Sequence, residues 1–306
     1  MPSFRGIATG ELSREIRLDR YIAEKLGMLS RSQIKARELK ARVNGKEAKF
    51  SRIVRPGDTI ELFWNEADPV NIVPEDIPLD ILYEDDRVIV INKPRGMVVH
   101  PGAGNRRGTV ANALFFRKLQ HSGPSGTAAG LRPGIVHRLD KETSGVMIAA
   151  WDDDALAFLS GQFKSRKAKK KYIAIINGIP REDHGRIETN ITRDPKDRKR
   201  FTVADRGRAA LTCYQVIKKW QKHSLVLLKP KTGRTHQLRV HMRYIGHPVS
   251  GDPVYGFADR FFPDAGLMLH SRRLEITLPG DGAPRVFRAP LPQRFCEMIH
   301  RLNGRE

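Results

Sequence analysis

One carboxylate, that of Asp140, lies in a polar turn between two apolar stretches of the chain. Ile135 and Val136 precede it, and the run from Val146 to Ala150 follows it, so a strand is expected on each side. A catalytic group is often carried in this way, on a loop that a rigid scaffold holds in place. Taken alone, however, Asp140 is more simply explained as the cap of a turn, and its role depends on what the rest of the chain supplies.

Tyr172 opens a predicted strand that follows a helix expected over residues 153–166. Its flat face is suited to stacking on a nucleic-acid base, and its hydroxyl can carry a proton. A lone tyrosine in this position more often belongs to the core. The surroundings favour a nucleic-acid surface instead, because a run of basic residues comes directly before it: Lys164, Arg166, Lys167, Lys169, Lys170 and Lys171.

Residues 232–241, which read Thr-Gly-Arg-Thr-His-Gln-Leu-Arg-Val-His, add the guanidinium groups of Arg234 and Arg239. A guanidinium beside a carboxylate keeps the carboxylate ionised and orients it, although Arg234 could equally contact a phosphate. His236 and His241 are five residues apart, so a zinc site has to be considered. The His-Glu-x-x-His arrangement is missing and no third ligand is evident. We therefore expect hydrogen-bonded histidines on a helix and no metal.

The chain of 306 residues carries 55 Lys and Arg against 34 Asp and Glu, which gives a net charge of +21. Such an excess predicts a polyanionic partner, and nucleic acid is the usual one. The sequence has no run of about 18 apolar residues, and its charged start from Met1 to Arg20 lacks an apolar signal region. We therefore expect a cytoplasmic protein with no membrane association. Cys213 and Cys296 form no metal-binding or redox pattern.

Residues 17–65 have the pattern of a small, basic module. Apolar residues recur at helical spacing from Leu18 to Leu26, and Ser-Arg-Ser-Gln at residues 30–33 has the form of a capping box that opens a second helix. Asn44-Gly45 predicts a tight hairpin turn. Between Arg31 and Arg55 there are nine Lys or Arg and two acidic residues. A solvated helix pair rarely has such one-sided charge, so this module is expected to bind nucleic acid.

The chain is predicted to divide into four parts. Residues 66–86 contain eight Asp or Glu, no Lys or Arg, and three prolines, which is typical of an extended linker. A hairpin is expected over residues 81–91 and a final helix near residues 292–302. Strands and helices alternate irregularly between them, which predicts an α+β fold rather than a βαβ series. The parts are a flexible N-terminus, 1–16, the basic module, 17–65, the acidic linker, 66–80, and a main domain, 81–306.

The segment around Asp140, which reads Gly-Ile-Val-His-Arg-Leu-Asp-Lys-Glu-Thr-Ser-Gly-Val, resembles the signature of the pseudouridine synthases of the RluA type. Residues 92–101 resemble the first motif of that family, and residues 232–256 resemble its third. Residues 17–65 resemble the S4 RNA-binding module. The fold that these resemblances imply is a mixed, largely antiparallel sheet flanked by helices, joined to a small S4 module.

The resemblance also implies a role for each candidate residue. Asp140 would be the catalytic residue, Tyr172 would lie over the target base, and Arg239 would pair with the carboxylate. Arg138 would fill the space left by a flipped-out uracil, although a salt bridge with Glu142 explains this arginine equally well. The other residues expected to bind RNA are Arg31, Lys35, Arg37, Lys46 and Arg234.

The implied function is the isomerisation of uridine to pseudouridine in RNA, by a monomer and without a cofactor. Large-subunit ribosomal RNA is the expected substrate, with transfer RNA as the alternative. The signature offers one Asp and not the carboxylate pair of ordinary glycosidases. Attack at C1′, attack at C6 and a glycal route all remain open. Two further classes are a non-catalytic RNA-binding or ribosome-assembly protein of the same fold, and a nucleoside hydrolase or glycosidase that would release free uracil.

Overall fold

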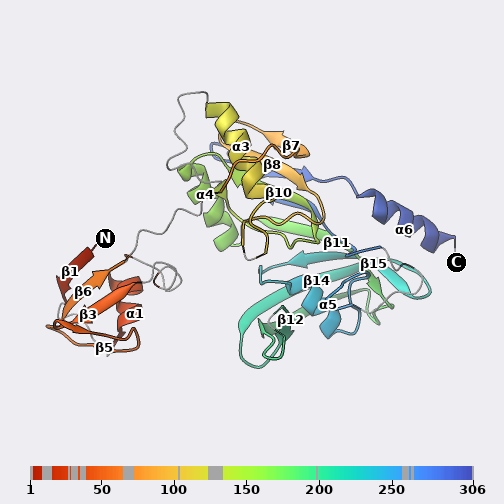
Figure 1. Ribbon diagram of the computed structural model, residues 1–306. Coiled ribbons are helices and arrows are strands. Elements are labelled where there is room, and N and C mark those ends of the chain that lie inside the picture. The colour runs from red at the N-terminus through yellow and green to blue at the C-terminus, as the bar shows by residue number, and fades with distance from the viewer. Residues whose placement is uncertain are drawn as a thin grey trace. The chain divides into compact units, whose positions relative to one another are not determined.

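The computed structural model divides the chain into two compact units, Met1–Asn71 and Ile72–Glu306 (Figure 1). We call them the N-terminal unit and the C-terminal unit and describe each by itself. The structure describes residues 3–8, 16–26, 28, 34, 39–64, 72–102, 104–122, 134–197, 199–256, 262 and 265–304.

The N-terminal unit is built on an antiparallel sheet with the strand order β1-β6-β3-β4. A second strand pair, β2 with β5, and a short helical segment accompany this sheet. The core of the unit includes Leu18, Ile22 and Ile60, which are almost completely buried. Its elements are β1 (Ser3–Ile7), β2 (Ile16–Arg17), α1 (Leu18–Arg20), the π-helix η1 (Tyr21–Lys25), β3 (Lys40–Val43), β4 (Lys46–Glu47), β5 (Ile53–Val54) and β6 (Thr59–Phe63).

The predicted hairpin turn joins β3 to β4. Asn44 and Gly45 both have positive φ angles, of 55° and 75°, as this two-residue turn requires. The Asn44 side chain fixes the turn, because its amide donates to Asp58 (2.7 Å) and its oxygen accepts from the backbone N–H of Thr59 (2.8 Å). The local sequence therefore predicts this part of the unit correctly.

The prediction of a flexible N-terminus over residues 1–16 is wrong for Ser3–Ile7. These residues form β1 and pair along the whole length of β6, from Ser3 opposite Phe63 to Ile7 opposite Thr59. Ile7 is exposed, so the strand owes its order to main-chain pairing with β6 rather than to an apolar pattern of its own. A pattern-based reading of the terminus could not detect such an edge strand.

Part of the predicted acidic linker, 66–80, belongs to the C-terminal unit. Residues 66–71 lie outside the described part of the chain, whereas residues 72–80 belong to the C-terminal unit. Ile72 is buried against α3, and the Asn112 side chain of that helix donates to the carbonyl oxygen of Val73 (2.7 Å). The backbone N–H of Glu75 donates to the carbonyl oxygen of Asn112 (3.2 Å). Proline and acid content alone did not reveal that this segment packs against a helix.

A large sheet forms the C-terminal unit, with the strand order β13-β12-β14-β15-β11-β16-β10-β8-β7, while β17 pairs with β16 and β9 with β10. All of these pairs are antiparallel except β10 with β16. The predicted α+β class with a mixed, largely antiparallel sheet is therefore confirmed. The strands are β7 (Ile81–Glu84), β8 (Val88–Lys93), β9 (Gly134–Ile135), β10 (Ser144–Ala150), β11 (Lys169–Asn177), β12 (His184–Arg193), β13 (Phe201–Val203), β14 (Arg208–Lys219), β15 (His223–Pro230), β16 (Leu269–Ile276) and β17 (Arg285–Arg288).

The parallel pairing of β10 with β16 is short and close. It joins Ser144 to His270 and Gly145 to Ser271. Gly145 has a φ of 116°, and a Cβ atom on it would lie 2.2 Å from the carbonyl oxygen of Ser271. Only glycine fits here, because both the backbone conformation and the approach of the two strands exclude a side chain.

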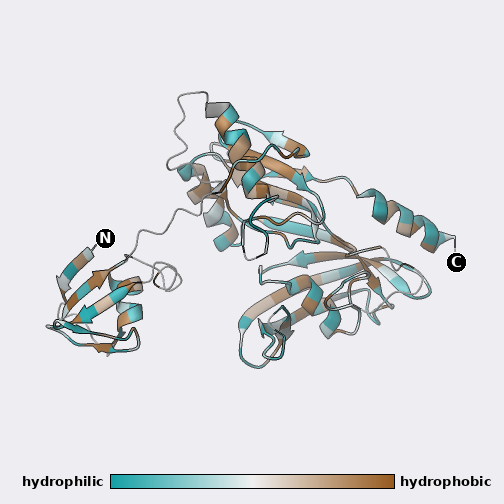
Figure 2. Ribbon diagram, in the orientation of Figure 1, coloured by the Kyte–Doolittle hydropathy of each residue, from teal (hydrophilic) through white to brown (hydrophobic). Residues whose placement is uncertain are grey.

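Four helices of the described chain cover this sheet: α3 (Val110–Ser122), α4 (Asp153–Lys164), α5 (Gln237–Tyr244) and α6 (Gln293–Asn303) (Figure 1). Helix α4 begins where the sequence predicts, because the Asp152 side chain accepts from the backbone N–H of Ala155 (2.7 Å) and so caps it. Strand β10 is buried along its whole length, and Figure 2 shows hydrophobic residues concentrated on the central strands around it. The loop that carries Asp140 leads directly into this rigid strand.

Candidate active site

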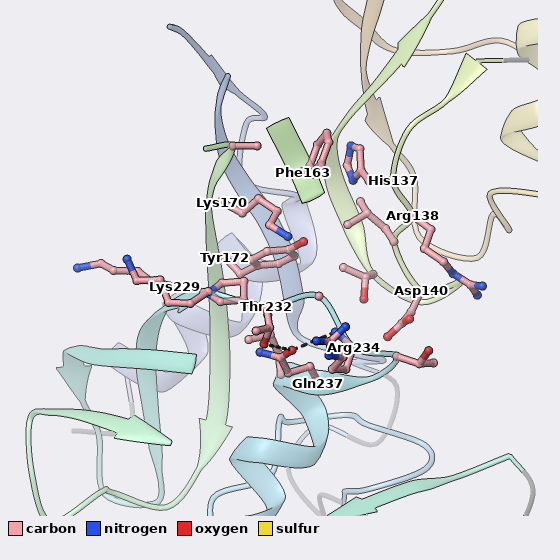
Figure 3. Close-up of a pocket in the computed structure, with 18 of the residues that line it drawn as sticks. His137, Arg138, Asp140, Phe163, Lys170, Tyr172, Lys229, Thr232, Arg234 and Gln237 are labelled. Atoms are coloured by element: carbon pink, nitrogen blue, oxygen red, sulfur yellow. Dashed lines mark hydrogen bonds between the residues drawn. The ribbon is translucent and has the colours of Figure 1, made fainter. Parts of the chain in front are cut away.

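A pocket of about 840 Å³ opens in the C-terminal unit. The residues that line it fall mainly into three segments that are far apart in the sequence: 136–143, 163–172 and 229–239. Figure 3 shows Arg138 and Asp140 on one wall and Tyr172 on another. The structure thus brings the five candidate residues of this unit to one place: Arg138, Asp140, Tyr172, Arg234 and Arg239.

The first motif supports the Asp140 loop from behind. The completely buried Lys93 donates through Nζ to the carbonyl oxygen of Lys141 (3.2 Å) and to two carbonyl oxygens of its own segment. The backbone N–H of Gly96 donates to the same Lys141 carbonyl (2.8 Å). Burial lowers the pKa of Lys93 to about 8, with the Asp140 charge acting in the opposite direction. Residues 92–101 therefore have a structural role, which is to fix the loop immediately after Asp140.

Arg239 is the guanidinium beside Asp140. Its Nη1 lies 3.6 Å from Oδ2 of Asp140, while its Nε and Nη2 both donate to Asp252 at 2.7 Å. Arg239 and Asp252 are buried, whereas the Asp140 side chain keeps 20% of its surface exposed. The bidentate pair with Asp252 therefore holds the guanidinium rigidly and leaves Nη1 as the nitrogen nearest the partly exposed Asp140 carboxylate.

Sequence reasoning missed Asp252 as the principal partner of Arg239. Asp252 also accepts from the backbone N–H groups of Val254 (2.9 Å) and Tyr255 (3.0 Å). Burial acts to raise its pKa, but the hydrogen bond and charge of Arg239 outweigh burial and lower it below the ordinary value. Asp252 stands inside the segment 251–256, which continues the third motif, so the motif contained the signal. Only the fold shows that Asp252 binds Nε and Nη2 of Arg239, while Asp140 lies nearest to Nη1.

His236 lies in the pocket and not simply on a helix face. It precedes α5 with a left-handed φ of 56°, and its Nε2 is 4.0 Å from Oδ2 of Asp140. Burial lowers its pKa, and the charge of Asp140 opposes this shift. His241 behaves as predicted, since it is buried in α5 with Thr189 (3.0 Å) and Thr212 (2.9 Å) as hydrogen-bond partners. In the part of the chain that the structure describes, no group of His, Cys, Asp and Glu could hold a metal ion.

Tyr172 stands at a bulge where the pairing of β11 with β16 shifts register. The residue is 8% exposed and lines the pocket. Burial raises the pKa of Tyr172 to about 12, while Ser271 acts in the opposite direction. The ring is therefore both part of the core and part of the pocket wall, which combines the two alternatives drawn from the sequence.

Arg138 and Arg234 occupy different environments at the pocket. Arg138 is exposed, and the acid suggested as its salt-bridge partner, Glu142, instead pairs with Arg95 (2.9 Å). Arg234 is partly buried, and its Nε donates to the carbonyl oxygen of Ala209 (3.0 Å) rather than to Asp140. Burial, reinforced by nearby arginines, lowers the pKa of Arg234. Arg239 and not Arg234 is therefore the neighbour of the carboxylate.

Residues 87–244, more than half of the chain, match the sequence model of the RNA pseudouridylate synthases. The chain belongs to this family. As a pseudouridine synthase it isomerises uridine in RNA to pseudouridine. The comparisons favour this activity over the hydrolase and the non-catalytic alternatives.

Several curated relatives cover most of this pseudouridine synthase. One from Aquifex aeolicus, called an uncharacterized RNA pseudouridine synthase, is 43% identical over 92% of both chains. The ribosomal large subunit pseudouridine synthase D of Borreliella burgdorferi is 44% identical over 92% of this chain and 87% of its own. The human RNA pseudouridylate synthase domain containing 4 is a solved structure with 30% identity and a TM-score of 0.59, covering 73% of this chain and 93% of that one.

The structure describes only one of the four N-terminal residues that are expected to bind RNA. Lys46 lies exposed in β4, whereas Arg31, Lys35 and Arg37 fall outside the described residues. The binding roles of these four residues therefore remain predictions.

None of the helices that the structure describes has the length and apolar composition needed to span a membrane.

Proposed function

We propose that this pseudouridine synthase acts on large-subunit ribosomal RNA, with Asp140 as its catalytic carboxylate. The observation that carries the catalytic role is the composition of the pocket wall: among its described lining residues Asp140 is the one acidic side chain. A glycosidase would need two carboxylates on either side of the bond that breaks. A single carboxylate fits an isomerisation in which the uracil leaves and rejoins the same sugar.

In this proposal Arg239 and Tyr172 assist Asp140. Arg239 orients the carboxylate through Oδ2, because its other nitrogens are bound to Asp252 and its Nη1 lies 3.6 Å from that oxygen. The partly exposed Asp140 can then attack C1′ or C6 of the nucleotide, or promote glycal formation. The reaction requires no redox step and no group donor, so the proposal includes no cofactor. The Tyr172 ring offers a flat surface for the uracil.

The ribosomal substrate is supported by the relative named for the large subunit and by the net charge of +21. We propose further that the enzyme works as a monomer in the cytoplasm. Pseudouridine mapping on total RNA from cells with and without the gene tests the substrate. The expected result is the loss of pseudouridine at discrete positions of large-subunit ribosomal RNA. Loss in transfer RNA alone would replace this substrate by the alternative.

Tyr172→Phe is expected to slow a single turnover by roughly 10² or more while RNA affinity stays near the wild-type value, because general acid–base groups typically contribute about 10² to 10⁴. Phe keeps the stacking face of the ring. It loses the hydroxyl that can carry the proton released from C5 of the uracil once C5 is joined to the sugar. Rapid-quench measurement of pseudouridine in excess enzyme, with a parallel binding titration, separates the two effects. If Tyr172→Phe is fully active and Tyr172→Ala is inactive, the ring serves for stacking alone.

Arg138 is proposed to fill the space that the target uracil leaves in the RNA. Extruding a base from a stack costs a few kcal/mol, and Arg138 is exposed at the pocket. We expect Arg138→Ala to slow the reaction on structured RNA more than on an unstructured oligonucleotide, since only stacked RNA needs the replacement. The ratio of the two single-turnover rates is the measurement. Equal losses on both substrates would contradict this role.

The N-terminal unit is proposed to be an S4 RNA-binding module. Between residues 40 and 55, its described part carries six exposed basic residues. We expect the triple variant with Gln at Lys40, Lys46 and Lys49 to bind ribosomal RNA less tightly and with a weaker salt dependence. Each lost phosphate contact lowers the log–log salt slope by roughly 0.7 to 0.9. An unchanged slope in filter-binding titrations would show that this surface does not touch RNA. The six residues are Lys40, Arg42, Lys46, Lys49, Arg52 and Arg55.

A further inference from the structure

His236 is the second basic side chain that faces the carboxylate of Asp140. Its Nε2 lies 4.0 Å from Oδ2 of Asp140, the same oxygen that Arg239 approaches to 3.6 Å. His236 occupies the N-cap position of α5, yet its side chain makes no capping hydrogen bond. Its backbone adopts the left-handed conformation, which is uncommon for a residue with a side chain. Helix capping therefore does not explain why a histidine stands here with its ring in the pocket.

The hydrogen bonds of Tyr255 determine which nitrogen of His236 carries the proton. The backbone N–H of Phe201 donates to the Tyr255 hydroxyl oxygen at 2.8 Å. Donation to Nδ1 of His236, 2.8 Å away, is the arrangement that also gives the hydroxyl hydrogen a partner, and we adopt it here. Nδ1 is therefore the acceptor, which leaves the proton of the neutral ring on Nε2. Nε2 is the nitrogen that faces Asp140.

Tyr255 is held firmly enough to impose this arrangement. Its ring is 2% exposed and lies against two guanidinium groups, with the carbon of Arg239 at 5.0 Å and that of Arg200 at 5.5 Å from the ring centre. Its backbone N–H donates to Asp252 (3.0 Å), and its carbonyl oxygen accepts from Arg243 (3.2 Å). The hydroxyl therefore has a fixed position between Phe201 and His236.

The charges around His236 decide which form of the ring is useful. Burial is the largest influence on the pKa of His236 and lowers it from the ordinary value, while two carboxylates and two guanidinium groups act on the ring electrostatically in opposite directions. A neutral ring offers Asp140 one hydrogen bond without adding a second cation next to Arg239. An imidazolium would bind the carboxylate more tightly and make it a weaker base and nucleophile. The charged and titratable groups that face the ring are Arg138, Asp140, Arg239, Asp252 and Tyr255.

We propose that His236 is a positioning residue whose neutral ring directs its Nε2 proton at Oδ2 of Asp140. It shares that oxygen with Arg239, so that Oδ1 stays free to react with the nucleotide. The inference rests on the proposed role of Asp140. Hydrogen bonds of an active site are often long before substrate binds, so the proposal requires that the 4.0 Å separation of Nε2 and Oδ2 shortens when RNA fills the pocket.

Three variants test this role through the pH dependence of the single-turnover rate. In the wild type, protonation of His236 should lower the rate as the pH falls, with the midpoint below pH 6.5. His236→Gln keeps a neutral N–H donor that does not titrate, so the His236-dependent part of this acid limb should disappear. Tyr255→Phe removes the hydroxyl that donates to Nδ1. Only the neutral ring can accept this hydrogen bond, so the variant destabilises the neutral form. The pKa of His236 should then rise, and the acid limb should move to higher pH.

His236→Ala should lower the single-turnover rate roughly 10- to 100-fold with RNA affinity unchanged, because a displacement of about 1 Å can cost about 10² in rate. The matched control is His184→Gln, at the exposed start of β12, which should keep the wild-type rate and profile. Thermal unfolding checks that each variant is folded. If His236→Ala does not fold, the profiles of His236→Gln and Tyr255→Phe still decide the question.

The outcomes separate this inference from the proposed function. A wild-type acid limb in His236→Gln, or a wild-type rate in folded His236→Ala, overturns the positioning role. An active Asp140→Asn measured in the same assay overturns the catalytic assignment itself. An inactive Asp140→Asn together with unaffected His236 variants leaves the proposed function in place and removes His236 from it.

Discussion

Asp140→Asn should abolish pseudouridine formation while RNA affinity remains close to that of the wild type. The substitution keeps the size of the side chain but removes the charge, the nucleophile and the base together. Asp140 is the one acid on the described wall of the pocket, so no neighbouring carboxylate can take its place. We expect a fall of more than about 10⁴ in single-turnover rate, beyond the range of about 10² to 10⁴ for an acid–base group, because Asp140 is the proposed reactive group and not only a proton carrier.

The measurement is pseudouridine content after incubation of excess enzyme with ribosomal RNA transcript, beside a binding titration with the same RNA. Glu142→Gln is the matched control, since it removes a carboxylate from the same loop whose partner is Arg95 and not Arg239. Turnover of Asp140→Asn within tenfold of the wild type would contradict the catalytic assignment. A loss of RNA binding instead of turnover would make Asp140 a recognition residue.

Asp252→Asn should impair both stability and activity. Arg239 and Asp252 form a buried bidentate pair, and removing one charge from a buried pair costs roughly 3 to 5 kcal/mol of unfolding free energy. The released guanidinium then has Asp140 as its remaining carboxylate within reach, at 3.6 Å. A tight Arg239–Asp140 pair would occupy the reactive oxygen atoms, so we expect turnover to fall at least about 100-fold, in line with the cost of misplacing a catalytic group.

Denaturant titration and single-turnover kinetics measure the two effects separately. Glu188→Gln breaks an exposed ion pair on β12 and serves as the control, because exposed pairs contribute about 0 to 1 kcal/mol. A stability loss no larger than that of the control would show that the buried pair is not a structural anchor. Full activity at a temperature where Asp252→Asn is folded would show that Arg239 does not depend on Asp252.

The residues that belong to continuous motifs could be predicted from the sequence. Asp140, Tyr172 and Arg239 could each be singled out because each motif carries its own turn or strand signal. The structure then shows that these three residues, from separate segments, line one pocket. The hairpin at Asn44-Gly45 and helix α4 were predicted for the same reason, since their determinants are local.

The features that were missed depend on contacts between distant parts of the chain. Asp252 was overlooked because its role depends on how α5 meets the following loop, which residue spacing does not reveal. Residues 3–7 were assigned to a flexible terminus because their order comes from β6, more than fifty residues later. His236 was expected to be an ordinary helix residue, and its left-handed backbone becomes visible only in the structure.

The parallel pairing of β10 with β16 has a consequence for how the enzyme is made. Asp140 is carried by the loop before β10, and that strand completes its hydrogen bonding only with Ser271 and its neighbours near the end of the chain. Pairings of such large sequence separation form slowly and late. During synthesis the N-terminal unit can fold first, while the pocket has to wait until β16 has left the ribosome. If the N-terminal unit binds RNA as proposed, a nascent chain can engage RNA before it is able to modify any uridine.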